Sequence, residues 1–217
     1  MQSVERRSRL LERLFVQGDV TEDDVEDAVL RAFLLDLPVS EIFAFLREMK
    51  PCLLPVAAAN IPQFSKYDDM DRALNVIAYC GQSQISYLDL GKYLCAKGTK
   101  DGACTKYGEN HGKLAQQHGF AYFRGRGLAA TYLGTCYLHL EETARRRVRA
   151  RMCLRIPIVQ QTLLAAEHGT VYMTDVLAQY LASSTVKRRR PNVHAIFDAL
   201  RQVADASVKE LLNQVVW

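Results

Sequence analysis

Residues 107–133, with the sequence YGENHGKLAQQHGFAYFRGRGLAATYL, decide the fold that we predict. Apolar residues at helical spacing predict a helix over 107–118, and the glycine that follows ends it. The run 120–123 favours a β-strand, and residues 124–127 alternate arginine with glycine, which is typical of a tight turn. A returning strand is predicted over 128–133. The stretch therefore indicates a helix followed by a β-hairpin with a basic tip.

The residues before this stretch predict another helix, which precedes the helix over 107–118 and packs against it. Ser86 precedes Asp89 by three residues, an arrangement that caps the start of a helix. Lys97 and Gly98 close that helix, and the small polar residues 99–105 form the turn between the two helices. A helix pair followed by a hairpin has the order of a winged helix. We therefore predict a mainly α protein containing a winged helix-turn-helix with a small β-hairpin wing, plus additional N- and C-terminal helices.

Charge is distributed unevenly along the chain. Residues 97–155 contain twelve Lys/Arg and four acids, whereas residues 1–75 contain nine Lys/Arg and fourteen acids. An evenly mixed surface would show no such difference in net charge between segments. The asymmetry therefore favours an anionic partner on the basic side. The alternative is a solvated basic face without a partner. Combined with the helix, helix, hairpin order, the basic stretch predicts binding to double-stranded DNA.

The outward face of helix 107–118 supplies the predicted base contacts. Leu114 and Ala115 mark the inward face, which leaves Glu109 and several amide and lysine side chains outside. Asn and Gln can pair with adenine, and Lys can donate to guanine or phosphate. The arginines of the wing tip and the lysines around the turn would contact phosphates. The predicted DNA-binding residues are Lys97, Lys100, Lys106, Asn110, Lys113, Gln116, Gln117, Arg124, Arg126, Lys187, Arg188 and Arg189.

The flanking regions are predicted to be helical. Residues 1–65 form an acidic helical region for dimerisation or partner docking, and prolines break the pattern between 50 and 66. Residues 66–217 form the winged-helix domain with a C-terminal helical extension. The arginine-rich helix 141–151 could flank nucleic acid, pair with acids of the N-terminal helices, or be solvated. Pro191 is predicted in the first turn of a helix.

Other classes of function find little support. The chain has no phosphate-binding glycine loop and no H-E-x-x-H or G-x-S-x-G motif, so we predict neither an enzyme nor a cofactor. The six cysteines are too dispersed for a disulfide framework, and Cys95, Cys104, His111 and His118 lack the close cysteine pair of a structural zinc site. Both histidines are predicted to be core or boundary residues. No run of apolar residues is long enough to span a bilayer, which favours a cytoplasmic protein.

Several short sequence motifs follow one another between residue 74 and about residue 206. His118-Gly119-Phe120 is followed by Ala130-Thr131-Tyr132-Leu133-Gly134, then by the segments 154–163 and 186–190. This order resembles the winged-helix module of bacterial restriction and defence-associated proteins, with the Leu-Thr-x-x-Gly signature altered at Ala130. The resemblance implies a transcriptional regulator or a DNA-binding component of an antiviral defence system, and a homodimer is expected. The alternative is a non-catalytic adaptor subunit whose winged helix contacts protein.

Overall fold

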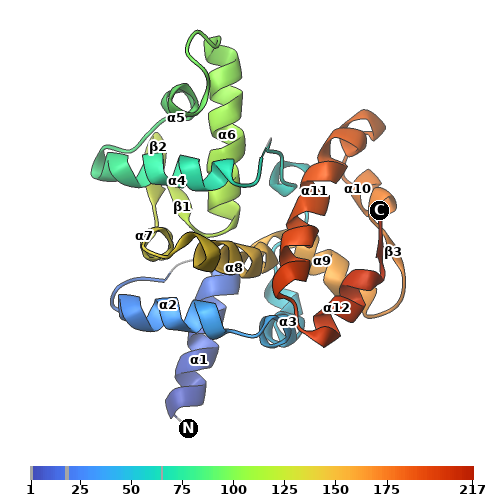
Figure 1. The fold of residues 1–217 in the computed structure, drawn as a ribbon. Helices are drawn as coiled ribbons and strands as arrows, with labels where there is room; N and C mark the ends of the chain where they lie inside the picture. Colours follow the sequence, from blue (N-terminus) through green and yellow to red (C-terminus); the bar gives the residue numbers. More distant parts are fainter. Residues whose placement is uncertain (1, 18–19, 65) are drawn as a thin grey trace.

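The computed structural model describes residues 2–17, 20–64 and 66–217, and the described chain is mainly helical (Figure 1). The helices are α1 (Gln2–Glu12), α2 (Asp27–Asp36), α3 (Val39–Glu48), α4 (Asp69–Cys80), α5 (Tyr87–Leu94), α6 (Asp101–Gln117), α7 (Tyr132–Leu138), α8 (Glu142–Met152), α9 (Pro157–Ala166), α10 (Met173–Ala178), α11 (Ser183–Val203) and α12 (Ala206–Asn213). The strands are β1 (Ala121–Arg124), β2 (Gly127–Ala130), β3 (Val171–Tyr172) and β4 (Val215–Val216). The prediction of a mainly α fold with a small β-hairpin is confirmed.

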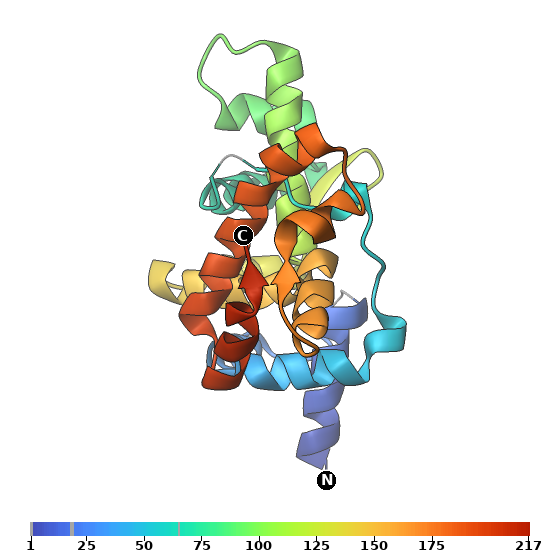
Figure 2. The same cartoon turned by 90° about the vertical axis from the view of Figure 1, so that its right-hand side faces the viewer.

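The molecule has an upper part made of α4, α5, α6 and the β1–β2 hairpin (Figure 1). Helices α7 and α8 cross below α6, and α1 to α3 lie beneath them. The C-terminal helices α9 to α12 form the right-hand side. In the turned view of Figure 2, α11 stands in front of α6, and the hairpin projects at the upper right. The α6 helix is therefore bordered by the hairpin and by α11.

Helices α5 and α6 approach each other closely because glycines remove side chains where the two helices cross. A Cβ atom on Gly108 would lie 2.1 Å from the Tyr87 carbonyl oxygen, and one on Gly91 would lie 1.8 Å from that of Cys104. These distances are far inside van der Waals contact, so only glycine permits this approach. The predicted cap is confirmed, because Ser86 Oγ accepts a hydrogen bond from Asp89 N at the start of α5.

The hairpin is joined to the segment that precedes α5. β1 and β2 pair antiparallel, with Phe123 opposite Leu128, and Ile85 adds an isolated bridge to Leu128 on the other side. Two backbone hydrogen bonds of 3.1 and 2.8 Å make this bridge. Gly127 is needed here, because a Cβ atom would lie 3.0 Å from the backbone nitrogen of Ile85. The turn after β1 is confirmed at 125–126, with Gly125 at φ +57°.

Three predicted boundaries were wrong. The α6 helix begins at Asp101 rather than at residue 107, so Lys106 lies on the helix and not in the turn. The second strand ends at Ala130 because Thr131 caps α7, its Oγ1 accepting from Gly134 N at 2.9 Å. Pro191 lies inside α11, which begins eight residues earlier. The basic tetrad 187–190 is therefore part of a helix that continues through the proline.

Residues 1–65 share the core with the remainder of the chain. Leu30, Leu34 and Leu46 are fully buried in the same apolar cluster as residues of the C-terminal helices. Polar contacts also cross this boundary: Arg151 Nε donates to the Leu37 carbonyl at 2.7 Å, and Asp205 accepts from Ser40 N at 2.7 Å. The N-terminal helices are thus held against α8 and α12 by buried contacts. No helix in the described ranges is long and apolar enough to cross a membrane.

Candidate nucleic-acid interface

Five of the predicted DNA-binding residues line one small hollow between α6 and α11. The hollow has a volume of about 80 Å³ and is closed on one side by residues 59–63. Its predicted members are Lys106, Asn110, Lys113 and Gln117 of α6 and Arg189 of α11. The fold therefore places the basic residues 187–190 of α11 beside α6, the helix predicted to contact bases.

An acid inside the hollow neutralises part of its charge. Glu109 accepts from Lys106 Nζ at 2.8 Å and from Lys113 Nζ at 2.6 Å. These two hydrogen bonds lower the pKa of the Glu109 carboxyl below its ordinary value. Both lysines remain about half exposed, so they can turn from the carboxylate toward a phosphate. Glu109 thus holds the lysines in place and competes with any anionic ligand.

Residues 57–64, which we call the strap, cover the C-terminal half of this face. Gln117 Nε2 donates to the Asn60 carbonyl at 2.8 Å, and an Arg189 NH group donates to the Ile61 carbonyl at 2.5 Å. Ile61 is only 1% exposed, so the strap is anchored in the core. Burial also lowers the pKa of the Arg189 guanidinium. Because Arg189 binds the strap, it positions α11 and is less available to DNA than we predicted.

Gln116, the other glutamine predicted to contact DNA, also binds protein groups. Gln116 Nε2 lies 3.3 Å from both the Tyr87 hydroxyl and the Gly112 carbonyl. With both glutamine amides bound to protein groups, Asn110 is the amide of α6 closest to the open end of the helix. The exposed residues of α6 are 101–103, 105 and 106 in its N-terminal half, and Lys113 in its C-terminal half.

The remaining predicted cations are exposed. Arg124 ends β1 and Arg126 lies in the turn of the hairpin. The sequence contains no acid between Glu109 and Glu141. Lys97 and Lys100 lie at the loop between α5 and α6, at the top of Figure 1. Lys187 and Arg188 are exposed on α11. These six side chains border α6 from three separate elements.

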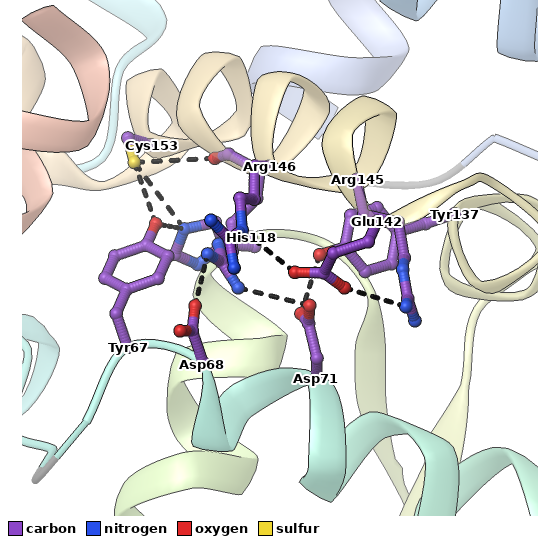
Figure 3. Close-up of polar contacts among 10 residues, drawn as sticks. Tyr67, Asp68, Asp71, His118, Tyr137, Glu142, Arg145, Arg146 and Cys153 are labelled. Carbon is purple, nitrogen blue, oxygen red and sulfur yellow. Dashed lines mark hydrogen bonds and ion pairs between the residues drawn. The ribbon is translucent and has the colours of Figure 1, made fainter. Parts of the chain in front are cut away.

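The arginine-rich helix α8 contributes far less to the surface than its composition suggests. Arg149 is 6% exposed and donates to Asp71 at 3.1 Å and to Asp68 at 2.6 Å. Its guanidinium also lies 4.5 Å from the centre of the Tyr67 ring. Asp71 accepts a further hydrogen bond of 2.6 Å from the hydroxyl of Tyr137 (Figure 3). Arg149 therefore pairs with acids at the start of α4 and not with acids of the N-terminal helices, whereas Arg146 and Arg147 of the same helix are exposed.

A second buried cluster adjoins this ion pair. The Tyr67 hydroxyl donates to His118 Nε2 at 2.5 Å and lies 3.0 Å from Cys153 Sγ (Figure 3). Nδ1 of His118 carries its hydrogen, because its partner at 2.9 Å is the Leu114 carbonyl, which can only accept. Burial lowers the pKa of His118 to about 3 and raises that of Cys153 to about 12. At neutral pH the cluster thus contains a thiol and a neutral imidazole, not the thiolate that a cysteine nucleophile requires.

The prediction that His111 and His118 are core residues is confirmed, since both are fully buried. Within the described parts of the chain, no three His, Cys, Asp or Glu side chains gather as metal ligands would. The burial of Asp71 could have been predicted, because it lies between the apolar residues Met70 and Leu74 on the inward side of α4. Its partner could not, because α8 contains five arginines and their sequence does not show which one is buried.

No family model, curated protein or solved structure matches this chain. Its function must be inferred from the arrangement of its own residues.

Proposed function

We propose that the chain is a DNA-binding protein whose residues 69–130 form a winged helix. The order of α4, the Ile85 bridge, α5, α6 and the β1–β2 hairpin supports this assignment. In such a module the second helix of the helix-turn-helix pair enters the major groove with its N-terminal residues toward the base edges. Here that helix is α6, and its N-terminal half is the exposed half.

The observation that carries the proposal is the placement of exposed cations around α6. Lys106 and Lys113 lie on the helix, Lys97 and Lys100 on the loop before it, and the wing arginines on the hairpin after it. Phosphate contacts from these elements would fix the duplex across α6, where Asn110 can pair with adenine. Lys187 and Arg188 extend the cationic surface onto α11.

The structure also changes which groups we expect to contact DNA. Gln116, Gln117 and Arg189 bind protein groups, so we assign them to positioning α6, the strap and α11. We propose that the protein acts in the cytoplasm of a bacterium as a homodimeric transcriptional regulator or as a component of a defence system. An adaptor that uses the same surface to bind an acidic protein is the alternative outcome of the test below.

The test is the affinity of the protein for mixed-sequence duplex DNA, measured by fluorescence anisotropy. The variant Arg124→Ala/Arg126→Ala removes two exposed cations of the wing, and Arg146→Ala/Arg147→Ala removes two exposed cations of α8 as a matched control. We expect the wing variant to lose affinity for every duplex and the control to retain it. Binding that is absent in the wild type, or equal in both variants, would refute the proposed interface.

A further inference from the structure

The β1 strand carries two adjacent exposed aromatic residues beside its basic tip. Tyr122 is 41% exposed and Phe123 is 46% exposed, and Arg124 follows them directly. Neither ring is needed to fill the core, which takes Ala121 and Leu128 from the hairpin instead. Exposed aromatic rings next to cations are the elements with which proteins bind unpaired bases, because every base has a face that can stack.

The two rings face different surroundings because successive side chains of a strand point to opposite faces. Phe123 pairs with Leu128, which points toward α6, since a Cβ atom on Gly112 would lie 2.6 Å from Leu128 Cδ1. The ring of Phe123 lies 5.3 Å from that of Tyr87 at an angle of 60°. Tyr87 in turn contacts Gln116 of α6. Phe123 thus stands between the basic turn and the helix that we propose to enter DNA.

Tyr122 belongs to the other face. It lines a hollow of about 630 Å³ together with Glu22, Asp23, Arg155 and Tyr132. The two carboxylates outnumber the one guanidinium, so this side is less favourable for a polyanion than the basic turn. On the side of Phe123, the hairpin tip presents the exposed Arg124 and Arg126. One acid, Asp89, stands two residues after Tyr87, where its carboxylate accepts a hydrogen bond of 2.6 Å from Ser86 Oγ.

We propose that Phe123, supported by Tyr87, is a stacking platform for an unpaired base, so that the protein prefers duplex DNA that ends in a single-stranded tail. This inference rests on the proposed function and names the form of DNA that the same surface takes. The duplex would lie along α6 and the wing arginines, while the first unpaired base of the tail stacks on Phe123. Arg124 and Arg126 would hold the phosphates on either side of that base.

The experiment compares a blunt duplex with the same duplex carrying a short single-stranded tail. A stacked base contributes about 1–3 kcal/mol, so we expect the wild type to bind the tailed duplex roughly 5- to 150-fold more tightly than the blunt one. A 2-aminopurine at the first unpaired position should lose fluorescence on binding, because stacking quenches it. Phe123→Leu should remove the preference and the quenching, and Phe123→Trp should retain both.

Tyr122→Leu is the matched control, since it removes an equally exposed ring from the same strand but from the acidic face. It should leave the preference intact, as should Tyr93→Leu on α5, whose ring is 65% exposed. Equal affinity of the wild type for blunt and tailed duplexes would overturn the inference and leave the proposed function standing. Equal loss in the Phe123 and Tyr122 variants would overturn it as well. Absence of binding to the blunt duplex, with tail binding that still depends on Phe123, would instead refute the duplex-binding function alone.

Discussion

Replacing Arg149 by methionine tests whether the arginines of α8 belong to the core or to the binding surface. The substitution keeps an unbranched, flexible side chain and removes the guanidinium group with its charge. Among the described residues, it leaves the Asp71 carboxylate, whose side chain is only 11% exposed, with the Tyr137 hydroxyl as its remaining donor. Loss of one partner of a buried ion pair costs about 3–5 kcal/mol. Since a domain is stable by about 5–15 kcal/mol, we expect a large fall in the free energy of unfolding.

The assay is urea denaturation at pH 7, monitored by circular dichroism. The control is Arg146→Met on the same helix, because Arg146 is exposed and pairs with the exposed Glu142 at 2.9 Å. An exposed pair contributes about 0–1 kcal/mol, so this control should unfold close to the wild type. The double variant Asp71→Leu/Arg149→Met removes both charges and should recover much of the lost stability.

Acidification provides a second test of the same pair. Burial raises the pKa of Asp71, and Arg149 opposes that rise. Without Arg149 the pKa rises further, so the native variant takes up a proton more readily than the unfolded chain does. Its stability deficit relative to the wild type should therefore shrink as the pH falls from 7 toward the ordinary aspartate value. A deficit below about 1 kcal/mol at pH 7, or a loss of DNA affinity in folded Arg149→Met, would refute this structural role.

Three further predictions follow from other parts of the molecule. Glu109→Gln frees two lysines from exposed ion pairs of about 0–1 kcal/mol each, so duplex affinity in an anisotropy titration should rise by roughly 2- to 10-fold, and a fall would contradict it. Burial lowers the pKa of His118 to about 3 in the folded protein, so the unfolded chain takes up a proton below about pH 6.5 that the folded chain does not, and stability should fall by about 1.4 kcal/mol per pH unit. The lowered pKa of His111 acts in the same direction, and a flat profile in urea melts from pH 6.5 to 4.5 would disprove the burial of His118 as a neutral group. Gly108→Ala should destabilise the fold by about 1–3 kcal/mol in thermal melts because its Cβ meets the backbone of α5, while Gly102→Ala on the same helix meets open space and should not.

Features encoded by neighbouring residues could be predicted from the sequence. The Ser86 cap and the glycine turn of the hairpin depend on spacing over a few residues, and the structure has both. The start of α6 could not be predicted in this way, because Gly102 and Gly108 lower helix propensity. Contact with α5 requires Gly108, and this tertiary contact outweighs the local preference.

Contacts between residues far apart in the chain could not be predicted from the sequence. The N-terminus of α3 is capped by Asp205, which lies 165 residues further along the chain than Ser40. The strap is held by Gln117 and Arg189, two residues that composition assigned to the binding surface. A charged or amide side chain has the same sequence signature whether it contacts DNA or a backbone carbonyl. Only the fold distinguishes the cations that remain exposed from those that hold the chain together.

The dependence of duplex affinity on salt tests the central claim most directly. Six exposed cations lie on the loop before α6, on α6 itself and on the wing: Lys97, Lys100, Lys106, Lys113, Arg124 and Arg126. Each phosphate contact contributes about 0.9 to the slope of log affinity against log salt concentration. We predict a slope near about −5 for the wild type, and a slope shallower by about 2 for Arg124→Ala/Arg126→Ala. A slope of zero, or one that the wing variant leaves unchanged, would contradict the account.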